Sequence, residues 1–200
     1  DTLYVIGKGL EESIKEFYPE LSVETAPAFR FQGVYRDSIK KSVNSDHTVL
    51  VVLYSVLEDA VKAMKFALET HQILGNEINV RWQIKPHPLT SKEKVLDALA
   101  EAIPEDWKWI DIDFHDCLDE VDVLMGSAST TCMEALARNK YVIIIGNQHG
   151  ITHNPVPFSV TNQLWKLCYS PAEAGEVIMS CVSSVDEISE AVSIRENYFE

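Results

Sequence analysis

The sequence predicts an α/β fold, a doubly wound parallel sheet of the Rossmann-like type with helices on both of its faces. Continuous apolar runs at residues 48–54 and 141–145 suit strands that are buried on both sides. Between such runs lie stretches with the spacing of one helical face, as in residues 57–68. Because parallel strands need crossover connections, this alternation indicates right-handed βαβ units.

Turn and capping residues place the individual elements. Pro19 closes a first helix, Gly75 stops the helix that begins near residue 57, and Ser91 caps the next one. A capping-box pattern at Ser184 and Glu187 predicts the start of the last helix. The predicted strands span residues 3–6, 21–23, 48–54, 78–84, 107–112, 121–125, 141–145 and 164–168. The predicted helices end near residues 18, 74, 102 and 137, and two more close the chain.

The chain divides into three segments. We interpret residues 1–25 as a βα segment at the edge of, or in the link from, an N-terminal domain outside this chain, and residues 26–47 as a linker. Residues 48–200 carry the strand–helix alternation and predict the main Rossmann-like domain. The first residue is not Met, which adds to the expectation that the chain is part of a longer protein.

Composition excludes several classes of partner. The formal net charge is −14, which argues against nucleic acids and against anionic membrane surfaces. No apolar run approaches the roughly 20 residues of a membrane span, so stable membrane insertion is not expected. The four cysteines form no C-x-x-C pair and are expected to be reduced, buried thiols. We therefore expect a cytoplasmic protein, which leaves room for a peripheral place at the inner face of the membrane.

In sheets of this kind ligands bind beyond the carboxyl ends of the strands, so the residues after each strand are the candidates for function. The first such turn, Gly7-Lys8-Gly9, has the G-x-G start of a dinucleotide fingerprint. However, Glu12 stands where the third glycine belongs, and together with Glu11 it would repel a pyrophosphate. The pattern favours a tight turn whose acidic residues complement the helix dipole.

A second strand ends in Lys85-Pro86-His87-Pro88. The two prolines hold the backbone extended and fix a lysine and a histidine at the ligand edge of the sheet. Imidazole can donate to a phosphate and the ammonium group can neutralise it. An ordinary loop with proline near a helix start explains the segment equally well, so both interpretations stay open.

The segment Gly126-Ser127-Ala128-Ser129-Thr130-Thr131 follows a third strand and opens a helix. Small side chains let a ligand approach the backbone, and the free N–H groups, the dipole and the hydroxyls attract an anion. Capping is the alternative, because Thr131 and Glu134 match a capping box. One cap needs fewer hydroxyls than this, which favours a ligand site. For Glu134, capping and ribose binding are equally good explanations.

The fourth strand leads into residues 146–155, which contain His149 and His153. Their spacing of four is that of a metal-binding helix, but Gly150 and Pro155 make a helix improbable and no carboxylate or cysteine completes the set. We expect no metal here. A flexible loop at this edge can instead cover a base or a sugar, which makes His149 a candidate contact.

These segments together resemble the C-terminal, nucleotide-sugar-binding domain of GT-B glycosyltransferases. The likeness is greatest to bacterial surface-carbohydrate and capsule biosynthesis transferases and to sialyltransferase-like enzymes. It covers residues 26–199 and rests on residues 26–31, 85–88, 122–131, 134–138 and 141–145. In that family a His-Pro motif and a Ser-Ser/Thr motif contact the nucleotide phosphate of the donor. These motifs correspond here to His87, Pro88, Ser129 and Thr130.

The resemblance implies a nucleotide-sugar donor as substrate and no cofactor. The general base of the family lies in its N-terminal domain, so we expect no catalytic base in this chain and no sugar transfer by the chain alone. The substrate-binding residues that we predict are Lys85, His87, Pro88, Gly126, Ser127, Ser129, Thr130, Thr131, Glu134 and His149.

Two alternative functions compete with glycosyl transfer, an epimerase on the same skeleton and a regulatory domain. Nucleotide-sugar 2-epimerases are similar, as are the glycerophosphotransferases of wall-polymer synthesis, but an epimerase needs several acidic and basic residues in its cleft and this chain offers few. A non-catalytic, flavodoxin-like regulatory domain would need an acidic cluster at the strand ends. The central strand ends instead in Tyr54 and Ser55, which ranks that alternative last.

Overall fold

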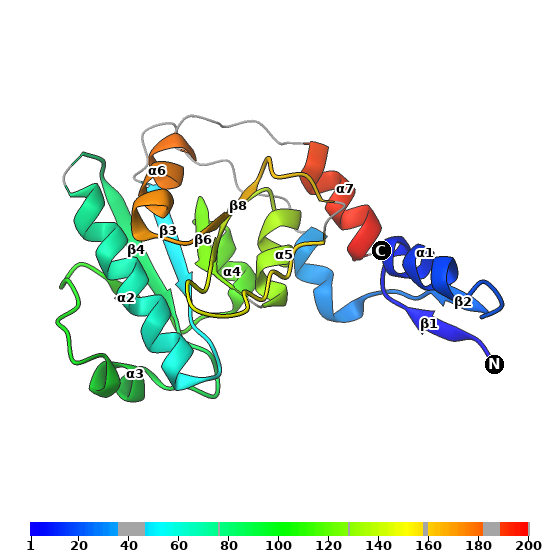
Figure 1. Ribbon diagram of the computed structural model, residues 1–200, viewed down its shortest axis with the longest axis horizontal. Helices are drawn as coiled ribbons and strands as arrows, with labels where there is room; N and C mark the ends of the chain where they lie inside the picture. Colours follow the sequence, from blue (N-terminus) through cyan, green and yellow to red (C-terminus); the bar gives the residue numbers. More distant parts are fainter. Residues whose placement is uncertain (36–46, 76, 128, 158–159, 182–188, 200) are drawn as a thin grey trace.

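The structure is a computed structural model that describes residues 1–35, 47–75, 77–127, 129–157, 160–181 and 189–199 (Figure 1). Three parts of the sequence predictions lie outside these residues: most of the second half of the predicted linker, Ala128, and the capping box predicted at Ser184 and Glu187. Within them, a six-stranded sheet with helices on both faces forms the main body, and a small βαβ unit stands at one end of the molecule.

All six strands of the main sheet are parallel, in the order β5-β4-β3-β6-β7-β8. The predicted doubly wound α/β fold is therefore confirmed. The order also excludes the flavodoxin-like alternative, in which the first strand lies between the second and the third. The strands are β3 (His47–Val52), β4 (Val80–Lys85), β5 (Lys108–Trp109), β6 (Val123–Gly126), β7 (Tyr141–Ile145) and β8 (Trp165–Cys168).

Alternation along the strands divides the core into two layers. Val49 and Val51 of β3 and Met125 of β6 face α2 (Leu57–Leu74), α3 (Lys92–Leu99) and α6 (Pro171–Cys181). Leu124 of β6 and Ile144 of β7 face α4 (Phe114–Leu118), α5 (Thr130–Ala137) and α7 (Ser189–Tyr198). Successive side chains of a strand point to opposite faces, so uninterrupted apolar runs are what a sheet covered on both faces requires.

Local signals account for most helix ends. The Ser91 side chain accepts a hydrogen bond from the Lys94 backbone N–H, as predicted for a cap, and Gly75 ends α2 with a positive φ of 52°. The short helix α4 was not predicted as an element. Asp113 caps it by accepting from the His115 N–H at 2.9 Å. None of the described helices combines the length and the hydropathy that crossing a membrane requires.

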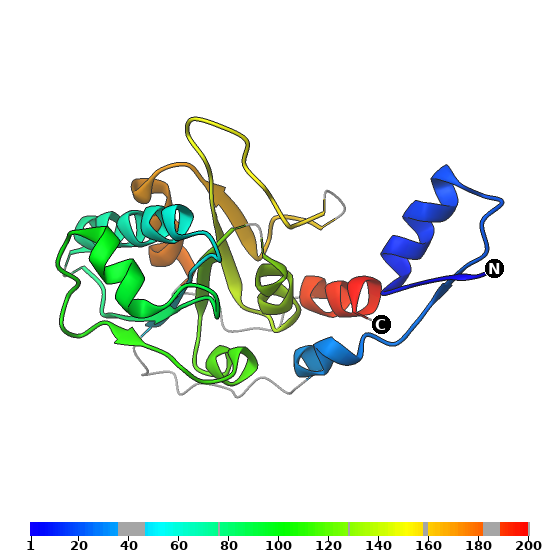
Figure 2. The same cartoon turned by 90° about the horizontal axis from the view of Figure 1, so that it is seen from below.

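The N-terminal unit consists of β1 (Leu3–Val5), α1 (Lys8–Phe17) and β2 (Val23–Thr25), and its two strands form a separate parallel sheet. It projects from the main body beside the end of α7 (Figure 2). Its helix buries no residue, and Phe17 is 76% exposed. Parallel sheets are normally covered on both faces, so this unit presents apolar surface that the described chain leaves uncovered.

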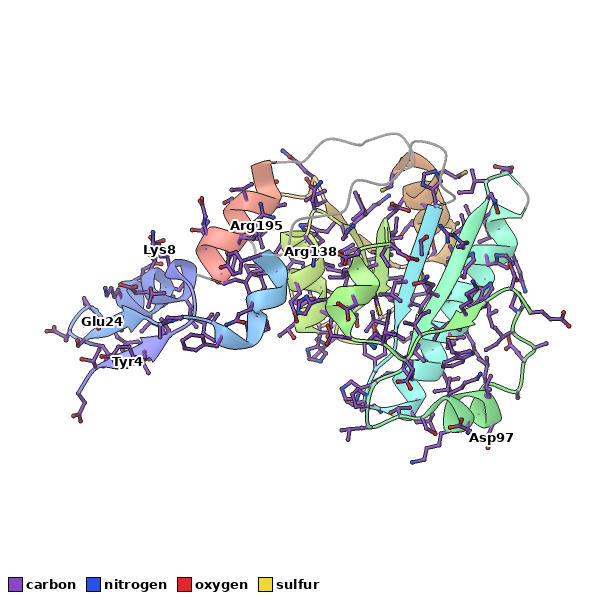
Figure 3. All side chains as sticks on the ribbon, turned by 180° about the vertical axis from the view of Figure 1, so that it is seen from behind. Tyr4, Lys8, Glu24, Asp97, Arg138 and Arg195 are labelled. Carbon is purple, nitrogen blue, oxygen red and sulfur yellow. The ribbon has the colours of Figure 1, made fainter. Side chains whose placement is uncertain are left out.

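Two segments connect the N-terminal unit to the main body, and both are held at the C-terminal end of α5. The buried Arg138 donates to the Gly33 carbonyl in the 3-10 helix η1 (Phe29–Tyr35) at 3.0 Å and pairs with Asp119. Arg195 of α7 donates to the Ala137 carbonyl at 2.8 Å. Figure 3 shows both arginines in this region. Arg138 is fully buried, and a buried charge is stable only where partners such as the Gly33 carbonyl and Asp119 compensate it.

Candidate functional site

The strand order reverses its direction between β3 and β6. The chain winds from β3 through β4 to β5 on one side, and from β6 through β7 to β8 on the other. At such a switch point the two connections leave in opposite directions and open a crevice at the carboxyl ends of the strands. The segments that follow β3, β4 and β6 therefore form the candidate site.

The helix α5 begins at Thr130, two residues before the start that a capping box at Thr131 would give. Ser129 is the N-cap and its Oγ accepts from the Thr131 backbone N–H at 3.3 Å and from the Thr131 hydroxyl at 2.8 Å. The structure does not show the alternative in which Thr131 and Glu134 form a capping box, because Ser129 caps that end of the helix. Thr130, the first helical residue, is exposed.

Glu134 has a different partner from either of those predicted. Its side chain is 8% exposed and its Oε2 lies 3.1 Å from His115 Nε2 in α4. The pair joins α4 to α5 below the first helical turn. Because a buried carboxylate needs such a partner, the geometry favours a structural role over ribose binding.

Ser127 is half-buried and follows β6, at the sheet edge where Tyr54 follows the neighbouring strand β3. Burial raises the pKa of Tyr54 above its ordinary value. Gly126, the residue before Ser127, is buried, and its Cβ position faces protein atoms. A Cβ placed on Gly126 would come no closer than 3.6 Å to another atom, the Leu124 Cδ2.

The loop after β4 is attached to the segment after β3. The Thr90 hydroxyl donates to the Ser55 carbonyl at 2.7 Å, and the Thr90 N–H donates to the His87 carbonyl at 2.9 Å. His87 Nδ1 accepts from the Leu89 N–H at 3.2 Å. The neutral imidazole therefore carries its proton on Nε2, which leaves an N–H donor on the far side of the ring. His87 is half-buried and Pro88 is exposed.

Lys85 turns toward another part of the sheet edge. Its Nζ donates to the Ile112 carbonyl between β5 and α4, and its charge acts to lower the pKa of the buried Cys117 thiol. Burial outweighs that effect and raises the pKa of Cys117. The lysine thus holds the β5–α4 connection, and no contact in the described residues brings it to the β6–α5 turn.

The loop after β7 is ordered by its own polar side chains. Asn147 Oδ1 accepts from the His149 N–H at 3.0 Å, and the Asn147 N–H donates to the Thr152 hydroxyl at 2.9 Å. Gln148 donates to the Tyr169 carbonyl after β8. The His149 side chain is exposed at this edge of the sheet. Among the described residues, no group of three histidine, cysteine or acidic side chains is arranged to hold a metal ion.

A pocket of about 810 Å³ lies between the N-terminal unit and the outer face of α5. Of the predicted ligand residues, Thr130 alone lines it. Its walls are largely apolar, with two carboxylates from α1 and with no lysine or arginine among the described residues that line it. The lining residues are Ile6, Gly9, Leu10, Glu12, Ser13, Glu16, Phe31, Thr130, Met133, Pro155, Pro157, Asn197, Tyr198 and Phe199.

The G-x-G turn after β1 serves packing, as the pattern favoured. Gly7 has a φ of 79°, and a Cβ there would lie 2.5 Å from the Asn197 carbonyl oxygen at the end of α7. Any side chain at this position would overlap backbone atoms. The space that a pyrophosphate would need at Gly7 is occupied by α7.

The sequence interpretation missed residues whose partners are distant along the chain. Tyr54, Thr90 and His115 were not singled out as part of the site, although Tyr54 was noted at the end of the central strand. A polar aromatic residue directly after a buried strand is the one signal that points to Tyr54. Nothing in the sequence pairs Thr90 with Ser55, or His115 with Glu134.

No protein-family model matches the sequence, and no curated protein matches it significantly. Among solved structures, the GtfA/B complex aligns with 100% of this chain and 42% of its own, at 15% identity and a TM-score of 0.52. The pneumococcal O-GlcNAc transferase GtfA, solved with UDP and GlcNAc, aligns with 91% of this chain and 37% of its own, at 12% identity and a TM-score of 0.48. The glycosyltransferase SnogD from Streptomyces nogalater aligns with 94% of this chain and 60% of its own, at 13% identity and a TM-score of 0.40.

These similarities concern the fold. The chain spans less than two thirds of each of the three structures. At 15% identity, the likeness to the GtfA/B complex shows a shared backbone arrangement. The chain has the α/β, Rossmann-like fold that the sequence predicted, and it shares this fold with the GtfA/B complex.

Proposed function

We propose that the chain is the nucleotide-sugar donor domain of a GT-B glycosyltransferase that acts in surface-polysaccharide biosynthesis. One observation carries the proposal. At the switch point between β3 and β6, the turn with Ser127 and Thr130 follows β6, and the loop of His87 is bonded through Thr90 to Ser55, which follows the neighbouring strand β3. Ligands of sheets with this strand order bind at that crevice.

The chemistry of the site suits the departing phosphate of a nucleotide-sugar. As the glycosyl bond breaks, negative charge grows on the phosphate oxygen. The first turn of α5, the Ser127 hydroxyl and the Nε2–H of His87 are donors that the fold positions before the reaction. Donors that need no rearrangement stabilise charge in a transition state most effectively. Ser129 and Thr131 contribute by fixing the helix start rather than through free hydroxyls.

We assign the acceptor to the pocket between α1 and α5. The pocket shares Thr130 with the donor turn, so a molecule bound there lies next to the proposed phosphate site. Glu12 and Glu16, with no lysine or arginine among the described lining residues, disfavour a phosphate and favour hydroxyl or amino groups. Its volume is within the range of small-molecule sites, about 300–1,000 Å³.

We further propose that this chain alone transfers no sugar. The apolar side of α1 is exposed in the described residues, with Leu10 47% and Phe17 76% accessible, which is the surface expected where another domain covers the unit. A cleft with one wall incomplete loses the positioning and the exclusion of water that closure provides. Donor-hydrolysis and transfer assays on this chain, beside a form that includes a preceding domain, test this; equal turnover by the chain alone would contradict it.

A thermal-shift screen with CMP, CDP, UDP and GDP tests the donor role directly. Binding to the folded state stabilises it by about 2.7 kcal/mol at a ligand concentration of 100 times Kd, so one nucleotide is expected to raise the Tm clearly above the others. The matching nucleoside, which lacks phosphate, is the control and is expected to shift the Tm little. If no nucleotide stabilises the wild-type chain, the proposed function is wrong.

A further inference from the structure

The helix α1 turns a polar face toward the pocket between the N-terminal unit and α5. Four pocket-lining residues follow one another along this helix at the spacing of a single face: Gly9, Glu12, Ser13 and Glu16. In the part of the chain that the structure describes, Glu12 and Glu16 have no hydrogen-bond or ion-pair partner, whereas the neighbouring Glu11 pairs with Lys15 at 2.5 Å. Two carboxylates without a counter-charge therefore belong to the wall of the pocket.

The helix itself does not account for this pair of charges. Carboxylates four residues apart repel each other across one helical turn. Glu12 lies near the start of α1, where the helix dipole favours an anion, but Glu16 lies in the last turn, where the dipole favours a cation. A polar helix face is usually a solvated one, yet this face borders a pocket whose other walls are largely apolar. A cation held between the two carboxylates would remove their repulsion.

Aromatic side chains stand around the carboxylates. The Tyr198 ring packs on Gly9, where an added Cβ would lie 3.2 Å from its Cε1, at the start of the same face of α1. Phe31 and Phe199 meet edge to face with their ring centroids 5.1 Å apart, and both line the pocket together with Met133. Aromatic faces attract a cation and also contact an apolar body. No lysine or arginine is among the described lining residues, so an anion would find no counter-charge.

We propose that the pocket binds an organic ammonium group attached to an apolar body, so that the acceptor is an amphipathic amine and not a neutral polyol. The ammonium group lies between Glu12 and Glu16, and the apolar body lies against the rings, with Thr130 on the side of the donor turn. That this ligand is the acceptor rests on the proposed function, whereas its charge follows from the lining of the pocket alone.

Three probes of similar size separate charge from apolar contact. Phenethylamine, 2-phenylethanol and 3-phenylpropionate share a phenylethyl group and carry a cation, a neutral hydroxyl and an anion. NMR titration of the wild-type chain measures their affinities. We expect phenethylamine to bind about fivefold more tightly than the alcohol, the size of a partly exposed ion pair, and the propionate to bind least. The preference is expected to shrink at high salt, because both carboxylates are exposed.

Charge-removing variants locate the effect. Glu12→Gln together with Glu16→Gln is expected to lower the affinity for phenethylamine to that for the alcohol and to leave the affinity for the alcohol unchanged. Glu20→Gln is the matched control, because it removes the same charge from the N-terminal unit at a residue outside the pocket lining.

The outcomes distinguish the ligand class from the donor role. Wild-type chain that binds amine and alcohol equally, or that binds no amine, would overturn the cationic ligand, as would an equal loss in Glu20→Gln. A chain that binds the amine as expected but none of CMP, CDP, UDP and GDP would overturn the proposed function and leave the preference of the pocket for a cation in place.

Discussion

Two turns of this molecule look alike in sequence and differ in what fills them. Gly7 stands between β1 and α1 in the N-terminal unit, and Gly126 is the last residue of β6 in the main sheet, ahead of α5. At Gly7 an added Cβ would lie 2.5 Å from the Asn197 carbonyl oxygen, whereas at Gly126 the nearest atom would be 3.6 Å away. A side chain at Gly7 would overlap the backbone of α7, whereas a methyl group at Gly126 would make only ordinary van der Waals contacts with Leu124 and Val52.

The difference shows that a glycine at a strand end is ambiguous until its neighbours are known. The helix starts differ in the same way. The N-cap of α1 is Gly7 and makes no side-chain hydrogen bond, while the N-cap of α5 is Ser129 with its hydroxyl in place. A helix start that is closed by the backbone of another helix cannot receive an anion, which makes the turn after β6 the better candidate for a ligand site.

The largest effect is expected for Gly7→Ala. Its backbone combination of φ 79° and ψ 143° is strained for any L-residue, and the new methyl group would overlap the backbone of α7. We expect a loss of roughly 3 kcal/mol in the free energy of unfolding. Urea denaturation measures it. A Gly9→Ala variant is the matched control, since a Cβ there meets its nearest atom at 3.1 Å and needs a smaller shift; similar losses in both variants would contradict the special status of Gly7.

The next largest effect concerns binding. His87→Ala removes the Nε2–H donor but leaves the bonds of Thr90 to Ser55 and to the backbone carbonyl of residue 87. We expect nucleotide affinity to fall by about 1–3 kcal/mol, as for a hydrogen bond to a charged group, with the fold retained. Calorimetry gives the affinity and circular dichroism the fold. An unchanged Kd would remove His87 from the phosphate site.

A moderate loss of stability is expected for Ser129→Ala. The N-cap hydroxyl satisfies the Thr131 N–H, and its removal is expected to destabilise the protein by about 1 kcal/mol. Ser129→Gly is the control, because glycine is tolerated at an N-cap and costs only a few tenths of a kcal/mol. Thermal unfolding of both variants distinguishes them. If alanine and glycine behave alike, the hydroxyl does not act as the cap.

The smallest change in stability is expected for Gly126→Ala. The added methyl group meets only ordinary van der Waals contacts, so the free energy of unfolding is expected to change by less than about 1 kcal/mol. Nucleotide affinity is also expected to change little, because the methyl group would face Leu124 and Val52 and not a ligand. A large loss of stability or of affinity would contradict this. Gly7→Ala and Gly126→Ala together thus test the comparison from both sides.

The main sheet was predictable because its signals are local. The uninterrupted apolar runs that become β3 and β7 have one good explanation, strands covered on both faces, and Ser91 and Gly75 mark helix ends by their own backbone preferences. The strand ends then follow, and with them the edge where ligands bind. The short helix α4 escaped prediction because five residues hold too few turns for a periodic pattern.

The site was predictable only in part, because its details depend on contacts between distant segments. Glu134 looked like a capping residue or a ribose ligand, and its partner His115 lies in another helix. Lys85 looked like a phosphate ligand, and it binds the Ile112 carbonyl instead. Neither contact follows from composition or spacing. They arise where the sheet brings separate loops together, which a single sequence does not record.

The attachment of both connecting segments to α5 has a mechanical consequence. Arg138 fixes η1 at the C-terminal end of this helix and Arg195 fixes α7 there, while Thr130 lies at its opposite end. The helix has eight residues, so about 12 Å separate its two ends at 1.5 Å per residue. One short helix therefore joins the two contacts that hold the N-terminal unit to the residue that borders the pocket.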